Sequence, residues 1–456
     1  MITIKNTKKK RVIYMKIHII GAGLAGCECS YQLAKRNIDV TLYEMKPQKF
    51  SPAHKSENFA EIVCSNSFKS NLITNACGLL KEELRLLDSL LIKTADEVAV
   101  PAGQALAVDR EKFSKAVTQK LESMPNIKIE RREVVNLEEI KTSEEDIIVI
   151  ATGPLTSDNL SEEISKLTGK DKLYFYDAAA PIVEKESIDM SIAFFADRYG
   201  KGDSSYLNLP MNKEEYEAFW QELVNAEVVN MHEFEKREIF EGCMPVEVMA
   251  KRGIDTLRFG PLKPVGFTDP RTGNRPYAIV QLRQDNEQGT MYNIVGFQTN
   301  LKFGEQKRVF SMIPGLQNAN YVKYGVMHKN TYINSPELLD ETYNLKTNKN
   351  IYFAGQISGV EGYVESIASG MVVGLNIAKK IKGGTKEEIK FTEETIIGSI
   401  AKYISTENKN FQPMNANFGI IKPLEEKIKD KKQKYEQMAK RSIENITNIT
   451  KNLQIN

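Results

Sequence analysis

Two cysteines stand in surroundings that could support covalent chemistry. Cys243 lies in FEGCMPVEVMA, after a glycine and before Met-Pro, and Cys64 lies in EIVCSNSFKS, where an apolar run gives way to polar residues. A thiolate is a strong nucleophile, but it forms at neutral pH only beside positive charge or a helix start. The residues alone leave open whether either cysteine reacts or packs. Packing is the expected role of the other three, Cys27, Cys29 and Cys77.

A glycine-rich turn near the start of the chain could bind a dinucleotide. The apolar run KIHII is followed by GAGLAG, a helical pattern and the strand-like VTLYE. In this order the first glycine permits a tight turn, the second lets a pyrophosphate approach, and the third allows close helix packing. The predicted contacts are Gly21, Ala22, Gly23, Leu24, Ala25 and Gly26, with Glu44 at the second strand's end for a ribose hydroxyl.

Two later glycine elements favour FAD as the dinucleotide. DIIVI runs into ATGP, and NIYFAG runs into a glycine-rich loop and a long helical pattern. Flavoproteins of the two-dinucleotide-binding class carry both features, and an acidic Glu44 favours an unphosphorylated ribose. Further cofactor contacts are predicted at Gly153, Gly355, Gln356, Glu361, Gly362 and Tyr363. Many members of that class have Gly-Asp where this chain has Gly355-Gln356.

These elements predict an α/β fold. A Rossmann-like FAD-binding domain of the two-dinucleotide-binding type would be built from discontinuous segments, with an inserted α+β domain between them. The expected divisions are a flexible extension at 1–14, the first part of the FAD-binding domain at 15–196, the inserted domain at 197–324, and the second part at 325–456 with a basic C-terminal helix.

Composition narrows the functional class. Hydrophobic residues make up 41% and charged residues 27% of the 456 residues, and the net charge is +2. No apolar run reaches the roughly 18 residues of a membrane span. The odd number of cysteines, without a Cys-x-x-Cys pair, predicts neither a disulfide framework nor a metal site, and it favours the cytoplasm. Any nucleic-acid binding would need a local basic patch.

Long motifs in one order give the chain a family resemblance. It resembles the bacterial folate- and FAD-dependent tRNA (uracil-5-)-methyltransferases. The motifs are GAGLAG, EIVCSNSFKS, VPAGQALAVDREKF, AFFADRYGKGD, PMNKEEYEAF, FEGCMPVEVMAKRG, GPLKPVGFTDPRTGNRPYAIVQLRQDN, YNIVGFQTNLKFGEQKRVF, GVMHKNTYINSP, GQISGVEGYVES and FQPMNANFG. Gln104 departs from the family's usual glycine. A sister family of wobble-uridine flavoproteins is longer and has Thr-Thr at Val360-Glu361.

The resemblance implies a reaction. The family transfers a one-carbon unit from methylenetetrahydrofolate to C5 of the T-loop uridine in tRNA, with reduced FAD as carrier and reductant and NADH or NADPH reducing the flavin. It implies that Cys243 adds to C6 of the uracil as the nucleophile, and that Cys64 takes part in removing the C5 proton. The same chemistry on a uridine of 23S rRNA, or a catalytically silent FAD-containing RNA-binding protein, are alternatives. Retention of both cysteines argues against the silent protein.

RNA binding makes further demands on the surface. The target uridine must be extruded into a pocket, and affinity should come from phosphate contacts. Each of the basic residues named below could instead be a solvated surface charge or contact the anionic tail of folate. His54 could face a ligand. The candidates for phosphate contact are Arg271, Arg275, Lys302, Lys307, Arg308 and the lysine-rich C-terminal helix.

Overall fold

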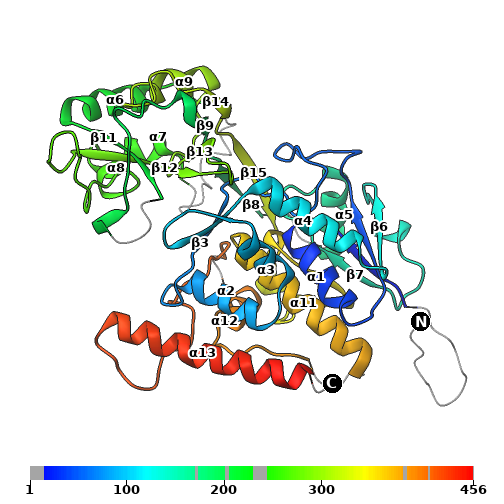
Figure 1. The fold of residues 1–456 in the computed structure, drawn as a ribbon. Coiled ribbons are helices and arrows are strands. Elements are labelled where there is room, and N and C mark those ends of the chain that lie inside the picture. The colour runs from blue at the N-terminus through cyan, green and yellow to red at the C-terminus, as the bar shows by residue number, and fades with distance from the viewer. Residues whose placement is uncertain are drawn as a thin grey trace, which may run out of the picture.

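The structure is a computed structural model that describes residues 15–169, 173–200, 205–229, 244–383, 388–408 and 411–454 (Figure 1). The expected extension at 1–14 and the predicted nucleophile Cys243 lie outside the described residues. No helix in the described ranges is both long and apolar enough to cross a membrane.

A six-stranded sheet organises the larger domain and confirms the predicted α/β class. Its order is β16-β17-β7-β1-β2-β6, and all neighbours are parallel except the β16–β17 edge pair. The carboxyl ends of β17, β7, β1 and β2 therefore meet at one edge, where open α/β sheets bind ligands. The strands are β1 (Ile17–Ile20), β2 (Val40–Glu44), β6 (Ile127–Arg131), β7 (Ile147–Ile150), β16 (Asn344–Leu345) and β17 (Asn348–Phe353).

Two helices that start at this edge pack closely against each other. These are α1 (Leu24–Ala34) and α11 (Tyr363–Gly383). A Cβ on Gly370 of α11 would lie 2.2 Å from the carbonyl oxygen of Ala25, so only glycine permits this approach. The other helices of this domain are α2 (Ala76–Leu86), α3 (Leu90–Glu97), α4 (Arg110–Glu122), α5 (Asp158–Thr168), α10 (Ser335–Leu338), α12 (Ile396–Ser405) and α13 (Lys431–Gln454).

A separate antiparallel sheet forms the core of the smaller domain, at the upper left of Figure 1. Its strands, in spatial order, are β10 (Phe194–Phe195), β11 (Leu207–Met211), β12 (Ala278–Gln284), β13 (Met291–Ile294), β9 (Ile182–Glu184) and β14 (Tyr321–Lys323). The accompanying helices are α6 (Lys213–Asn225), α7 (Val246–Lys251), α8 (Thr256–Phe259) and α9 (Phe303–Phe310).

The antiparallel sheet begins earlier in the chain than the expected boundary at 197. Both β9 and β10 precede that residue, and Val183 and Ile188 belong to the smaller domain's core. These strands have only three and two residues, too short to show an alternating pattern in the sequence. Two long strands, β8 (Leu173–Ala178) and β15 (Met327–Tyr332), pair antiparallel and connect the two domains.

A three-stranded antiparallel sheet lies after the first Rossmann unit. Its order is β3 (Ser67–Ser70), β5 (Ala105–Val108) and β4 (Ala99–Val100). The strand β3 begins three residues after Cys64, so this sheet limits where the loop of the cysteine can end.

Candidate functional site

A cavity of about 450 Å³ opens at the carboxyl edge of the parallel sheet. It is lined by thirteen of the predicted site residues: Gly21, Ala22, Gly23, Leu24, Ala25, Glu44, Cys64, Gly153, Gly355, Gln356, Glu361, Gly362 and Tyr363. Gly26 is not among its lining residues. A Cβ there would lie 1.9 Å from the carbonyl oxygen of Gly21, so this glycine serves the packing of α1 on the turn.

The first glycine turn has the shape that a pyrophosphate needs. Gly21 has φ +100°, and a Cβ would lie 2.6 Å from the carbonyl oxygen of Ala151. A Cβ on Gly23 would meet nothing within 4 Å, so space lies open beside the start of α1. Unpaired backbone N–H groups at a helix start favour an anion in that space.

The carboxylate of Glu44 is held in place by the backbone. Oε2 accepts a hydrogen bond from the Ala22 N–H at 3.1 Å, and Oε1 accepts one from the Lys46 N–H at 3.0 Å. The side chain is buried and lines the cavity beside the glycine turn. This position suits a ribose hydroxyl, because each carboxylate oxygen has a further lone pair that can accept a hydrogen bond from the hydroxyl.

The late glycine loop is braced by the stretch FQPMNANFG. The Glu361 N–H donates to the Met414 carbonyl at 3.0 Å, and the Met414 N–H donates to the Gly359 carbonyl at 3.2 Å. The Gln356 side chain donates to the carboxylate of Glu361. Residues near the C-terminus therefore fix a loop that lines the cavity, a dependence that sequence spacing alone did not indicate.

One buried carboxylate at the cavity has an oxygen without a partner. Glu365, in the first turn of α11, accepts a hydrogen bond on Oε1 from the Ala416 N–H at 2.8 Å. Its Oε2 has no hydrogen-bond partner in the described part of the chain, although the side chain is fully buried and lines the cavity. Such an atom fits a ligand that brings an N–H donor. Glu365 is not among the predicted cofactor contacts.

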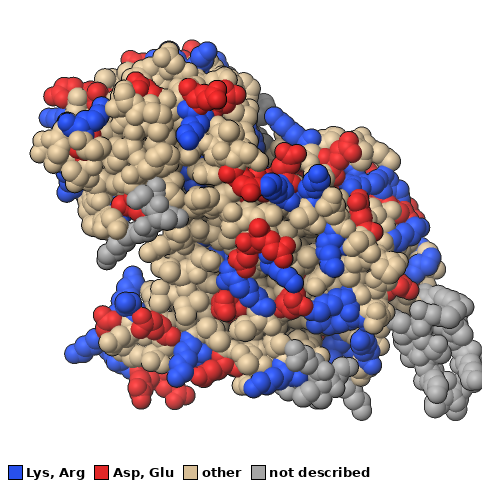
Figure 2. Space-filling model, viewed as in Figure 1, with Lys and Arg blue, Asp and Glu red and all other residues tan. Residues whose placement is uncertain are grey.

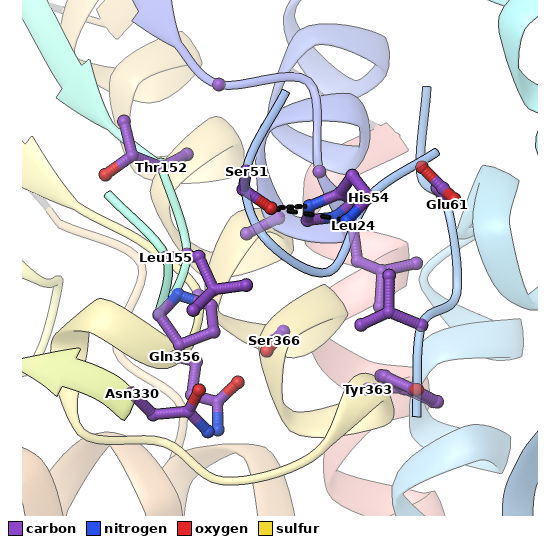
Figure 3. Close-up of a pocket in the computed structure, with 18 of the residues that line it drawn as sticks. Leu24, Ser51, His54, Glu61, Thr152, Leu155, Asn330, Gln356, Tyr363 and Ser366 are labelled. Carbon is purple, nitrogen blue, oxygen red and sulfur yellow. Dashed lines mark hydrogen bonds between the residues drawn. The ribbon is translucent and has the colours of Figure 1, made fainter. Parts of the chain in front are cut away.

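Besides His54, which could face a ligand, several polar side chains that were not predicted as contacts line the cavity. Figure 3 shows Ser51 and His54 on one side, across from Gln356 and Asn330. The Ser51 hydroxyl and His54 Nδ1 are 2.5 Å apart, and His54 lies on the cavity wall, where it was expected to face a ligand. From the smaller domain, Arg283 and Gln298 complete the lining.

The loop of Cys64 lies at the cavity and is surrounded by polar contacts. The Cys64 N–H donates to the Tyr363 hydroxyl oxygen at 2.9 Å, and its carbonyl accepts from the Arg110 guanidinium at 3.2 Å. The carbonyl of the preceding residue, Val63, accepts from the Lys323 amino group at 2.7 Å. Burial, reinforced by the charge of Arg110, lowers the pKa of Lys323 to about 8. Two cationic side chains therefore bind the backbone that carries this thiol.

The three cysteines expected to pack are buried away from this polar setting. Burial raises the pKa of Cys77 to about 11 and raises the pKa of Cys27 and Cys29 further. A thiol that stays protonated at neutral pH is a poor nucleophile.

The described residues on either side of Cys243 pair with a cavity-lining segment. The Val246 N–H donates to the Gln298 carbonyl at 2.7 Å, and the Val229 N–H donates to the Asn300 carbonyl at 2.9 Å. Since Gln298 itself lines the cavity, the chain re-enters the described structure beside the cavity wall, within three residues of Cys243.

The basic residues proposed for RNA contact differ in how far they are neutralised. Arg271 pairs with Asp269 at 2.8 Å, and Lys302 pairs with Glu227 at 2.5 Å. Arg308 pairs with two glutamates. Lys and Arg are interspersed with Asp and Glu across the face in Figure 2. In the residues that the structure covers, no three His, Cys, Asp or Glu side chains gather as a metal site requires.

Comparisons with known proteins match the chain to one family model and to curated methyltransferases. A family model described as Glucose inhibited division protein A matches residues 16–385. Two curated relatives named methylenetetrahydrofolate--tRNA-(uracil-5-)-methyltransferase TrmFO come from Acetivibrio thermocellus and Bacillus licheniformis. The first is 60% identical over 94% of this chain and 97% of its own length, and the second 58% over 96% and 99%.

Among solved structures, Aquifex aeolicus GidA in its form II crystal has a TM-score of 0.68 at 15% identity. The match covers 95% of this chain and 73% of GidA. At this identity the likeness shows the shared fold.

Proposed function

The chain belongs to the methylenetetrahydrofolate--tRNA-(uracil-5-)-methyltransferase family, and we propose that it forms 5-methyluridine in the T-loop of tRNA, with methylenetetrahydrofolate as carbon donor. The observation that carries this proposal is identity of 58–60% over nearly the whole chain to relatives of that name. The cavity at the carboxyl edge of the sheet supports it, because its position beside the glycine turns suits a dinucleotide.

The residues of the cavity would hold FAD. The N–H groups at the start of α1 would bind the pyrophosphate, Glu44 the ribose, and Glu365 Oε2 a ring N–H. Bound FAD would supply the hydride and relay the one-carbon unit, after reduction by NADH or NADPH.

We assign the covalent step to Cys243. Its thiolate would add to C6 of the uracil, which forms a carbon–sulfur bond and moves the C5–C6 electron pair toward C5. Uracil C5 thereby becomes able to attack an electrophilic carbon. After that attack the C5 proton would leave, and the bond between the one-carbon unit and its carrier would break, which leaves a methylene group on C5. A hydride would then convert this methylene to a methyl group, while the C5–methylene electron pair shifts to C5–C6 and expels the Cys243 sulfur. The backbone bond of Val246 to cavity-lining Gln298 supports this assignment, because it brings the neighbouring residues to the site.

We assign removal of the C5 proton to Cys64. A thiolate can accept a proton, and positive charge nearby favours the thiolate. The support is the position of Cys64 on the cavity wall, with the cations of Arg110 and Lys323 bound to its own carbonyl and to the preceding one.

The test is methylation of bare RNA by purified, flavin-loaded protein. Methylenetetrahydrofolate, NADH or NADPH and an unmodified tRNA transcript are supplied, and nucleosides are analysed by mass spectrometry. We expect 5-methyluridine in the tRNA and none in a 23S rRNA transcript. Methylation of the rRNA alone would replace the proposed substrate. No methylation of either RNA, with the flavin intact, would indicate a silent flavoprotein.

A further inference from the structure

Three aromatic rings form a continuous stack on the surface of the smaller domain. Phe303 stacks on Tyr324 with ring centroids 4.9 Å apart and an interplanar angle of 21°. Tyr324 stacks on Tyr321 at 5.1 Å and 9°. Phe303 begins α9 at one end of the stack and is 54% exposed. The stack therefore ends in a ring that is available to one more planar partner.

A buried glutamine holds the stack together. The Gln306 side chain donates to the carbonyls of Leu301 and Gly325 at 2.8 Å each, and its oxygen accepts from the Gly325 N–H at 2.8 Å. These bonds tie the start of α9 to the segment that begins with Tyr324, directly after β14, and Figure 1 shows α9 and β14 close together. The backbone that carries Phe303 is thus held in place, and its ring is stacked on Tyr324, before any partner binds, which lowers the entropic cost of binding.

The stack borders the cavity wall. Tyr324 lies between Lys323, whose amino group donates to the carbonyl of Val63, and Gly325, whose Cβ position would be 2.7 Å from the carbonyl oxygen of Ala179. Both Val63 and Ala179 line the cavity. One ligand could place one group on Phe303 and another group in the cavity only if that ligand is an extended molecule.

Charge beside the stack suits a phosphate. Lys307 is one turn along α9 from Phe303, so both side chains project from the same face. Within the described residues no carboxylate lies in ion-pair distance of Lys307, whereas Lys302 and Arg308 are neutralised by glutamates. An exposed ring with a cation one turn away matches a nucleotide, with its planar base and adjacent phosphate.

We propose that Phe303 is a stacking platform for an unpaired base of the RNA substrate next to the target uridine, and that Lys307 contacts the neighbouring phosphate. The proposal rests on the proposed function, in which a uridine leaves its folded loop to enter the cavity. Extruding that uridine removes a stacking partner from its neighbours. Phe303 replaces the lost partner, and aromatic rings do so for any base because every base has a π face.

The test compares two substitutions that differ in stacking ability. Phe303→Leu keeps apolar bulk but removes the ring, whereas Phe303→Trp keeps a ring. With flavin-loaded full-length protein and an unmodified tRNA transcript, we expect Phe303→Leu to raise Kd and KM about tenfold with little change in kcat. Phe303→Trp should stay within about twofold of the unsubstituted protein. Its added tryptophan emission should be quenched by the transcript, against a baseline from Trp220, the chain's single tryptophan.

A second pair of variants tests the phosphate contact. Lys307→Gln should lower the slope of log Kd against log salt by about one, and Lys302→Gln, whose lysine already pairs with Glu227, should change it less.

Several outcomes would overturn the platform. One is an unchanged Kd for the transcript in Phe303→Leu, and another is an equal loss of affinity in the leucine and tryptophan variants. A third is a change of oligomeric state in light scattering, which would indicate a protein interface. The unsubstituted protein is assayed for 5-methyluridine in the same reactions. If it methylates tRNA while Phe303→Leu is unaffected, only the platform fails; if it methylates nothing, the proposed function fails.

Discussion

The thiol of Cys64 sits beside positive charge that comes from distant parts of the chain. Arg110 is neutralised by Asp285, whose carboxylate lies 3.0 Å from its guanidinium. Lys323 has no carboxylate within ion-pair distance among the residues with described positions, so it supplies the net positive charge there. Because its pKa is about 8, Lys323 is charged at neutral pH and becomes neutral as the pH rises past 8.

Removal of the Lys323 charge should slow reactions of the Cys64 thiolate. We expect Lys323→Met to reduce the rate of iodoacetamide alkylation of Cys64 at pH 7 by about three- to tenfold. The deficit should shrink above pH 8, where the native lysine loses its own charge. Lys323→Arg should retain the native rate at pH 7. Peptide mass spectrometry gives the rate at each pH, and identical profiles for the methionine variant and the unsubstituted protein would exclude this electrostatic role.

Loss of the predicted nucleophile should separate cofactor binding from catalysis. We expect Cys243→Ala to keep its flavin absorbance but to lose tRNA methylation by more than about a thousandfold, because the proposed C6 adduct forms on the Cys243 sulfur. Cys77→Ala is the matched control, since that thiol is buried and donates to the Phe68 carbonyl. Substantial turnover in Cys243→Ala would remove Cys243 from the mechanism.

Local spacing predicted some of these residues and not others. The glycine turn and Glu44 follow from a strand–turn–helix–strand pattern contained in about thirty residues. Arg110 and Asp285 are separated by 175 residues, and Lys323 and Val63 by 260. No periodicity connects positions so far apart, because their proximity depends on how the two domains pack.

At the scale of elements, Glu83 connects three helices. Its buried carboxylate on α2 accepts hydrogen bonds from the Ile396 and Ile397 N–H groups at the start of α12, at 2.7 and 2.8 Å. It also accepts one from the Ser442 hydroxyl of α13 at 2.5 Å. Burial outweighs these bonds and raises the pKa of Glu83 to about 7. The docking of both C-terminal helices therefore depends on one titratable group.

This carboxyl group should make stability fall as the pH rises. The folded chain keeps Glu83 protonated to about pH 7, and the unfolded chain only to about 4.5. The stabilisation is therefore complete below pH 4.5 and is lost by pH 7. Urea denaturation should show that the unfolding free energy of the native protein falls between about pH 5 and 7.5. This fall should be about 2–3 kcal/mol larger than the change in Glu83→Gln over the same range.

The neighbouring residue provides a control for this measurement. Glu82 is half-exposed and pairs with Arg85 on the helix surface, so Glu82→Gln should follow the native pH dependence. Parallel pH profiles for the native protein and Glu83→Gln would show that Glu83 does not titrate in this range.

Element prediction succeeded where the apolar patterns were long. The strands β1, β2 and β7 and the long helix α11 lie where their patterns indicated. The start of the antiparallel sheet was misplaced because β9 and β10 pair through backbone bonds that few residues specify. Their position is determined by the longer β11 and β13 beside them.

For the whole molecule, the cavity is a junction between domains. Its lining combines the N-terminal turn, the late glycine loop, and Arg283 and Gln298 from the smaller domain. A ligand bound in this cavity contacts both domains at once, and it therefore adds contacts to those that the two domains already make with each other. Cofactor binding should therefore stabilise the folded arrangement of both domains and not one domain alone.

Removal of FAD should lower the thermal stability of the whole protein. At a free FAD concentration a hundredfold above Kd, we expect stabilisation of about 3 kcal/mol and a corresponding rise in Tm. Protein stripped of flavin and then reconstituted should recover the higher Tm in scanning calorimetry, while added riboflavin, which lacks the pyrophosphate and adenosine, should give a smaller rise. Equal Tm values with and without FAD would contradict binding in this cavity.

The brace between Met414 and the glycine loop has a consequence for biosynthesis. The first glycine turn is synthesised when about one-twentieth of the chain exists, but Met414, which braces the late glycine loop, is added only after most of the chain has been made. A nascent chain therefore carries a half-built flavin site through almost all of its synthesis. We therefore expect flavin loading to be one of the last events in the maturation of the protein.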